Sequence, residues 1–228
     1  MNCDCARAAV VGAAVLCAGG PALAGEAYLG VAGGASLRDD SGVESTPSFF
    51  VEDARYQTGW AARINAGYRV AVPGLDRLAL RPELALAYRR NEIDRGRGVA
   101  APTGTGVNTF NAGGTVHVLH GLANVWIDAD LPGVALTPYL GGGAGPARVW
   151  VDDFRAEGSN MPIADDADTV FGYQLGGGAS YPITETLSVT ADYRYTALDA
   201  TDMAHPGGRE FAVELDAHQI SLGLRYRF

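Results

Sequence analysis

Large apolar residues alternate with polar or small residues over the last ten positions of the chain. The apolar members of this series are Ile220, Leu222, Leu224, Tyr226 and Phe228. Because successive side chains of an extended strand point to opposite sides, all five share one face. The pattern predicts a β-strand with one oily face and one polar face. Taken alone, it fits an oily face that covers a protein core as well as one that contacts lipid.

The same alternation returns in seven earlier segments. The eight predicted strands span Glu26–Leu37, Thr58–Val70, Leu78–Arg89, Thr115–Leu131, Leu136–Val151, Thr169–Tyr181, Leu187–Ala197 and Gln219–Phe228. The alternation is least regular in the first half of the fourth segment and in the glycine-rich fifth. Eight strands of this length are enough to close a small barrel.

The connectors between these segments alternate strictly between short and long. Three short ones contain Pro-Gly pairs or other turn-forming residues and join strands two to three, four to five and six to seven. The four long, polar connectors lie near residues 38–57, 90–114, 152–168 and 198–215. In an antiparallel up-and-down arrangement, all long connectors therefore emerge at one end, as in membrane barrels with short turns on one side and long loops on the other.

Charges on the polar faces indicate which way the oily face looks. A soluble lipocalin-like barrel points its apolar residues inward around a ligand, whereas a membrane barrel points them at lipid. Arg81 and Glu83 share the polar face of one predicted strand, and a dry core does not accept such charges. On the apolar series, an Arg or Lys at the bilayer midplane would cost about 2–4 kcal/mol, and charge is almost absent there. We therefore expect an all-β, eight-stranded antiparallel up-and-down transmembrane β-barrel in which strand one pairs with strand eight.

Aromatic residues of the apolar series gather near the two ends of the predicted strands. Near the short turns lie Tyr68, Tyr181, Tyr226 and Phe228, and nearer the long connectors lie Trp60, Tyr88, Phe171, Tyr173 and Tyr195. Any one of them also fits ordinary cross-strand packing. As a set they favour two aromatic rings at the two membrane interfaces.

The amino terminus has the three parts of a secretory signal. A weakly positive start precedes a short apolar stretch, and small residues at Ala22 and Ala24 end it. We predict a cleavable signal peptide over residues 1–24 and a barrel domain over residues 25–228. A lipoprotein signal around Cys17 is the alternative, but Leu16 is bulky where such signals usually carry a small residue. All 3 Cys lie within residues 1–24, so the mature chain has none for disulfides.

Composition limits the classes of partner. The 228 residues suit one domain, and 31 of them are Gly, which disfavours long helices and suits tightly curled strands. Lys and Arg total 17 against 26 Asp and Glu, for a net charge of -9. An acidic surface argues against nucleic acid as a partner, because phosphate binding needs basic residues.

The chain resembles the small eight-stranded outer-membrane barrels of Gram-negative bacteria, including the OmpA-like transmembrane domain and related porin-family surface proteins. The residues that carry the likeness lie in 80–89, 124–128, 137–145, 187–195 and 222–228. The resemblance implies location in the outer membrane, with membrane lipid and lipopolysaccharide around the barrel. It also implies that Tyr226 and Phe228 form the signal read by the barrel-assembly machinery. We expect a monomer without a cofactor or a metal.

The inward charges form the candidate functional site. They are Arg63, Arg81, Glu83, Asp128, Asp192, Arg194 and Arg225. Glu83, Asp128 and Asp192 could pair with the arginines across neighbouring strands, as buried charges must. Such a network either seals the interior or forms a gate for small ions. Because side chains just fill an eight-stranded barrel, we favour the seal.

Catalysis is the sharper alternative and lacks a coherent set of residues. Its candidates are His117, His120, His218 and Ser221, but His218 and Ser221 are three positions apart on one strand and face opposite sides. The glycine run at 141–145 has no following helical pattern, so a nucleotide loop is not expected. We expect a structural and surface role that is not enzymatic. A loop-mediated adhesin, a narrow channel and a lipid A-modifying enzyme remain alternatives.

Overall fold

The structure is a computed structural model, and it describes residues 25–38, 41–43, 49–100, 112–156, 167–199, 201–204, 210–213 and 216–228. The predicted signal peptide, with its three cysteines, lies outside the described residues and stays a prediction. Within the described ranges, no helix is long and apolar enough to cross a membrane.

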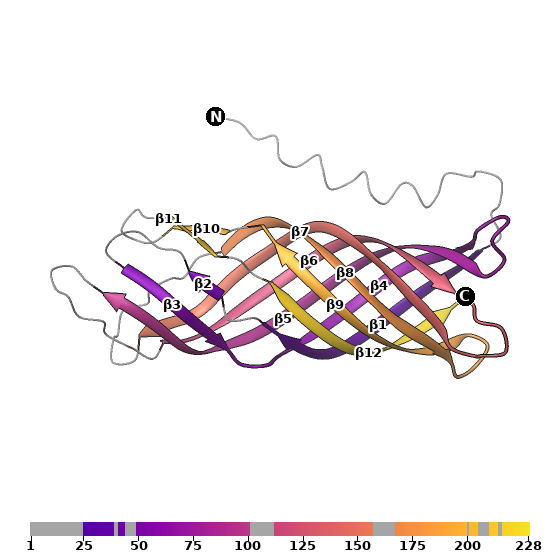
Figure 1. Ribbon diagram of the computed structural model, residues 1–228, viewed down its shortest axis with the longest axis horizontal. Helices are drawn as coiled ribbons and strands as arrows, with labels where there is room; N and C mark the ends of the chain where they lie inside the picture. The colour runs from indigo at the N-terminus through magenta and orange to yellow at the C-terminus, as the bar shows by residue number, and fades with distance from the viewer. Residues whose placement is uncertain are drawn as a thin grey trace, which may run out of the picture.

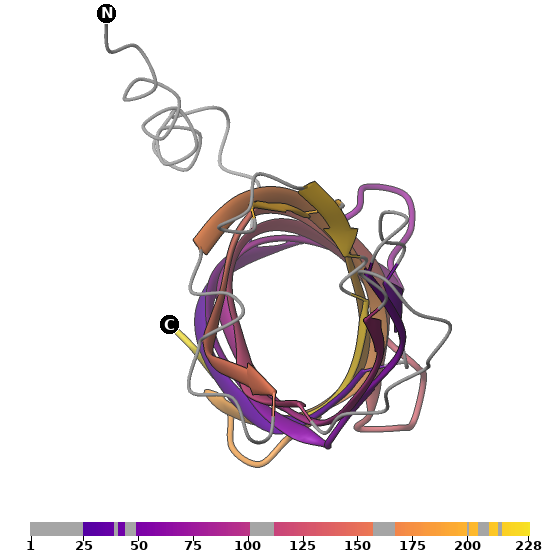
Figure 2. The same cartoon turned by 90° about the vertical axis from the view of Figure 1, so that its left-hand side faces the viewer.

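Eight long strands close into an antiparallel barrel, which confirms the predicted fold class. These strands are β1 (Gly25–Leu37), β4 (Gly59–Ala71), β5 (Leu78–Ala100), β6 (Ala112–Ala129), β7 (Thr137–Ala156), β8 (Ala167–Pro182), β9 (Leu187–Leu198) and β12 (Ala217–Arg227). Each pairs with its neighbour along the chain, and β1 also pairs with β12. Viewed along its axis, the barrel is a closed ring (Figure 2).

The seam between β1 and β12 is fully paired. It runs antiparallel from Tyr28 opposite Arg227 to Leu37 opposite His218, and the Phe228 amide extends it by donating to the Ala27 carbonyl oxygen at 3.1 Å. The predicted pairing of the first and last strands is therefore confirmed. In lipid this closure is required, because an open edge would leave backbone groups without partners.

Exposure alternates along every barrel strand in the predicted sense. On β12, Leu222 is 66% exposed whereas Ser221 beside it is 6% exposed. On β5, Leu80 and Leu84 face outward while Arg81 between them is buried. In this central part of the barrel the outer face is apolar and the interior polar, the reverse of a soluble barrel. Toward the long connectors the interior also holds apolar side chains, among them Val118, Leu122 and Val149.

The short turns and the carboxyl terminus lie together at one end of the barrel (Figure 1). Gly74 and Gly133 in two of these turns have φ angles of 80° and 72°, in the left-handed region. Residues other than glycine rarely adopt such angles, so the Pro-Gly pairs at these sites fit the turns.

At the other end, the sheet extends beyond the predicted strand ends. β5 is 23 residues long and β7 is 20. Beside the β5 extension lie β3 (Phe49–Tyr56) and then β2 (Ser41–Val43), and β10 (Thr201–Ala204) pairs with β11 (Glu210–Val213) (Figure 1). The expectation of loops throughout the long connectors is therefore wrong in part. Outside the bilayer the outer face need not be apolar, so the strands continue without the alternation that reveals them.

Candidate functional site in the barrel interior

The seven predicted interior charges come from five strands and lie inside the barrel. Six are at most 8% exposed, and Arg225 is half-buried. The strands β4, β5, β6, β9 and β12 supply Arg63, Arg81, Glu83, Asp128, Asp192, Arg194 and Arg225. Because every second side chain of each strand points inward, residues that are far apart in sequence come together in one layer.

Glu83 lies at the centre of this layer. Its two carboxylate oxygens accept five hydrogen bonds of 2.8–3.2 Å. The donors are Tyr28, Asn65, Arg81, Asn124 and Trp126. Removing a carboxylate from water carries a penalty of several kcal/mol, and this number of donors is what offsets it. Arg194 adds a longer contact of 4.0 Å to the same side chain.

Asp192 forms a second centre nearer the long connectors. Arg63 Nη2 lies 3.0 Å from its Oδ2, and Arg194 Nε lies 2.7 Å from its Oδ1. The hydroxyls of Tyr139 and Ser221 donate to it at 3.2 and 3.1 Å. One carboxylate thus serves two arginines.

Asp128 forms a third centre toward the short turns. Arg81 Nε lies 3.0 and 3.1 Å from its two oxygens, and Arg69 Nε lies 3.2 Å from Oδ2. Arg69 also reaches the partly exposed Asp130 at 2.6 Å. Arg81 therefore links Asp128 to Glu83, since its Nη1 lies 3.2 Å from the Glu83 Oε2.

Arg225 differs from the prediction that it pairs with a carboxylate. Its guanidinium lies 5.1 Å from the ring centre of Tyr28 and 5.5 Å from that of Tyr139. Arg81 lies over the same Tyr139 ring at 4.8 Å, and Arg194 over the Trp126 ring at 4.5 Å. For Arg225 these cation–π contacts take the place of an ion pair, whereas Arg81 and Arg194 have both kinds of contact.

Three aromatic residues at inward positions of the alternation were not among the predicted site residues. Tyr28, Trp126 and Tyr139 are all at most 5% exposed, and Trp126 and Tyr139 pack edge to face at 5.8 Å. The available signal was a large ring at an inward position of a series that otherwise holds small and charged residues. These rings supply the bulk that fills the interior between the ion pairs.

The described residues enclose two small cavities in the interior, each with room for about one water-sized particle. Arg63 lines both. One cavity lies toward the long connectors, beside His120 and Gln174. The other lies between Arg63, Arg194 and Arg225. The ring in Figure 2 is drawn from the backbone alone, and the buried side chains described above lie inside it.

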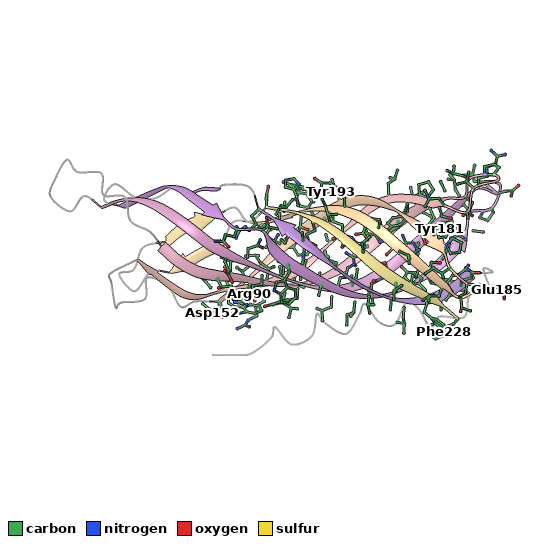
Figure 3. All side chains as sticks on the ribbon, turned by 90° about the horizontal axis from the view of Figure 1, so that it is seen from below. Arg90, Asp152, Tyr181, Glu185, Tyr193 and Phe228 are labelled. Carbon is green, nitrogen blue, oxygen red and sulfur yellow. The ribbon has the colours of Figure 1, made fainter. Side chains whose placement is uncertain are left out.

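The outer face carries aromatic groups at both levels of the barrel. Tyr193 lies in the half nearer the long connectors, whereas Tyr181 and Phe228 lie at the short-turn end (Figure 3). At the first level, His117 stacks on Trp150 at 5.2 Å and accepts or donates a 2.7 Å hydrogen bond with Tyr88. This distribution fits the predicted aromatic rings, with Trp150 and Tyr193 as members that the pattern did not identify.

The residues considered for catalysis are spread over different surfaces. Ser221 lies inside the barrel on Asp192, while His218 stacks against Tyr193 on the outer face, so this pair is on opposite sides as predicted. His120 lies inside, with Nε2 3.2 Å from the Gly145 carbonyl oxygen. His117 belongs to the outer aromatic group. The structure brings no two of these four together.

The comparison with family models decides the family. The model for the outer membrane protein beta-barrel domain matches residues 9–228. The chain belongs to this family. Membership of the outer-membrane β-barrel family places the protein in the outer membrane of Gram-negative bacteria.

Several solved structures of outer-membrane proteins are similar to this chain at low sequence identity. Neisserial surface protein A is 21% identical, with a TM-score of 0.49, over 89% of this chain and 97% of that one. The attachment invasion locus protein Ail of Yersinia pestis is 11% identical, with a TM-score of 0.45, over 89% and 99%. The outer membrane protease OmpT from Escherichia coli is 8% identical, with a TM-score of 0.46, over 90% and 96%. At these values the similarities assign no role to this outer-membrane β-barrel, and the comparison with curated proteins finds no match.

Proposed function

We propose that this protein is a sealed, non-conducting barrel that holds a structured extension and its connectors outside the outer membrane. The observation that carries the proposal is the continuous buried layer from Asp128 through Arg81 and Glu83 to Arg194 and Asp192. An ion passing through would have to break these contacts. Removing one partner of a buried pair leaves an uncompensated charge at about 3–5 kcal/mol.

Conductance of the purified, refolded protein in a planar bilayer tests the seal. We expect no steady channels from the wild-type chain. We expect none from Trp126→Ala either, because this variant removes a fully buried ring from the central layer while leaving the ion pairs in place. Steady, reproducible channels from the wild type would contradict the seal and favour the narrow-channel alternative.

The external extension supports a surface role for the sealed barrel. From Tyr88, near the outer aromatic group, β5 continues to Ala100. With the usual rise and tilt of barrel strands, this continuation adds roughly 30 Å of height along the barrel axis. Paired strands hold connectors at a fixed distance from the membrane better than unstructured loops of the same length. Display of those connectors, including adhesion or ligand binding, is the role that this geometry favours.

Epitope tags distinguish the two ends of the barrel. A tag within residues 102–108 should be labelled by antibody on intact cells, and the same tag beside Gly74 in a short turn should be labelled only after permeabilisation. Labelling of both tags, or of the Gly74 tag alone, on intact cells would contradict the proposed orientation. Loss of cell attachment after shortening the 102–108 segment, with the barrel still folded, would identify the displayed surface as adhesive.

The surroundings proposed for the barrel follow from its outer face. Its apolar band would contact membrane lipid and lipopolysaccharide, and Tyr226 and Phe228 would be read by the barrel-assembly machinery. We propose a monomer, because each of the eight barrel strands is paired on both sides. The proposal includes no enzymatic reaction, cofactor, metal or nucleic acid.

A further inference from the structure

Positive charge exceeds negative charge in the central layer of the interior. Four arginines face three carboxylates there. The arginines are Arg63, Arg81, Arg194 and Arg225, and the carboxylates are Glu83, Asp128 and Asp192. Adding the neighbouring pair Arg69 and Asp130 leaves the difference unchanged. The layer therefore carries a surplus of one positive charge in surroundings of low dielectric constant, where such a surplus is costly.

The surplus is located near Asp192. Arg63 and Arg194 share this single carboxylate, at 3.0 and 2.7 Å. Arg225, close by, contacts two aromatic rings, and no carboxylate among the described residues lies within ion-pair distance of it. Arg225 is linked to the Asp192 group through Tyr139, whose ring it contacts and whose hydroxyl donates to Asp192.

A cavity lies where these three arginines meet. Arg63, Arg194 and Arg225 line it together with the carboxylates Glu83 and Asp192, so the lining carries three positive and two negative charges. Asn65, Tyr139 and Thr190 complete its polar part. Arg63 Nε and Arg194 Nη1 are buried and have no hydrogen-bond partner, although both side chains are more than nine-tenths buried. Leaving a buried donor unsatisfied costs about 1–3 kcal/mol, and more for a charged group. Two of the residues that line the cavity therefore carry unused donors, and the lining as a whole carries unbalanced charge.

We propose that this cavity binds one small monovalent anion, with chloride as the natural occupant. An anion accepts hydrogen bonds from both orphan N–H groups and neutralises the surplus charge at the same time. A water molecule of similar size satisfies the donors but leaves the charge. Larger anions such as gluconate do not fit a space of about one water-sized particle.

The refolded full-length protein in detergent tests the site by its thermal unfolding. At equal ionic strength, replacing sodium gluconate by sodium chloride should raise the melting temperature by about 2–4 °C, with saturation, since an ion bound only by the folded state stabilises it. Arg225→Gln removes the surplus charge and should abolish this chloride dependence. Arg225→Lys keeps the charge and should retain it.

Arg227→Gln is the matched control. Arg227 is on the same strand but at the short-turn end, where it pairs with Glu26 at 2.9 Å, and it does not line the cavity. This variant should keep the full response to chloride. Equal melting temperatures of the wild type in chloride and gluconate, or the same chloride response in Arg225→Gln, would overturn the proposal.

Crystals grown in sodium bromide give a readout that does not depend on a variant that folds. An anomalous peak between Arg63, Arg194 and Arg225 would support an anion, whereas ordinary water density without an anomalous signal would refute it. Neither outcome bears on the seal, because a barrel filled by water and side chains is equally closed to ions.

Discussion

Glu83→Gln is the sharpest test of the interior network, because it changes charge with little change in shape. Oε2 accepts hydrogen bonds from Tyr28, Asn65 and Arg81, and Oε1 accepts them from Asn124 and Trp126. If the glutamine oxygen takes the Oε2 position, its NH2 group points at the two remaining donors. Two hydrogen bonds are then lost and two donors lack an acceptor.

The magnitude follows from these contacts. Two orphan donors at about 1–3 kcal/mol each, together with lost compensation for Arg81, give a destabilisation of about 3–5 kcal/mol. Arg81 keeps Asp128 as a partner at 3.0 Å, which limits the loss. A change of this size lowers the folding equilibrium constant by about two to four orders of magnitude.

Urea titration of the protein in lipid vesicles, followed by tryptophan fluorescence, measures this free energy. Glu92→Gln is the matched control on the same strand. Glu92 pairs with Arg90 at 3.2 Å, but its side chain is 57% exposed, so its loss should cost at most about 1 kcal/mol. A Glu83→Gln effect no larger than that of Glu92→Gln would refute the argument that interior charges hold the barrel together.

Three further substitutions test other parts of the structure. In Gly34→Ala, the new Cβ would collide with the backbone carbonyl of Ile220 across the β1–β12 seam, so the amount of heat-resistant barrel on unboiled gels should decrease. In Gly33→Ala the atom nearest to the new Cβ is 3.7 Å away, and the barrel should form normally. Equal yields of the two variants would contradict the close approach at Gly34. Leu222→Arg, in the middle of the lipid-facing strand, should destabilise the barrel in vesicles by about 2–4 kcal/mol, and Leu75→Arg in a short turn by less than about 1 kcal/mol; similar values would argue against lipid at Leu222. Phe228→Ala should lower the fraction of assembled barrel in cells, while Phe171→Ala, also an exposed aromatic, should not, and normal assembly of Phe228→Ala would remove the proposed signal.

The barrel was predictable because lipid imposes a simple rule on both faces of each strand. At Leu80, Arg81 and Glu83, the alternation in sequence is the alternation in space. Even the glycine-rich β7, whose pattern is the least regular, keeps Tyr139 inside and Leu140 outside. Where the bilayer ends, this rule ends too. The part of β5 beyond Arg90 and the short strands β2, β3, β10 and β11 therefore could not be predicted from the sequence.

The membership of the interior layer was predictable, but its pairing was not. The alternation of side chains along β12 places Arg225 inside the barrel. Whether its guanidinium group contacts a carboxylate or an aromatic ring depends on strand register and tilt. The same is true of Glu83, whose five donors come from β1, β4, β5 and β6. One-dimensional periodicity gives the face of a residue and not its neighbours across the barrel.

The β1–β12 seam also orders events in time. Its outermost ion pair joins Glu26 to Arg227 across 201 residues, so the seam forms only after almost all of the barrel has been synthesised. Before then, any partly paired sheet has two open edges, which are prone to pair with other chains. A premature stop codon before β12 therefore does not yield a smaller barrel. It yields a chain that cannot close at all, so ring closure depends on translation as far as β12.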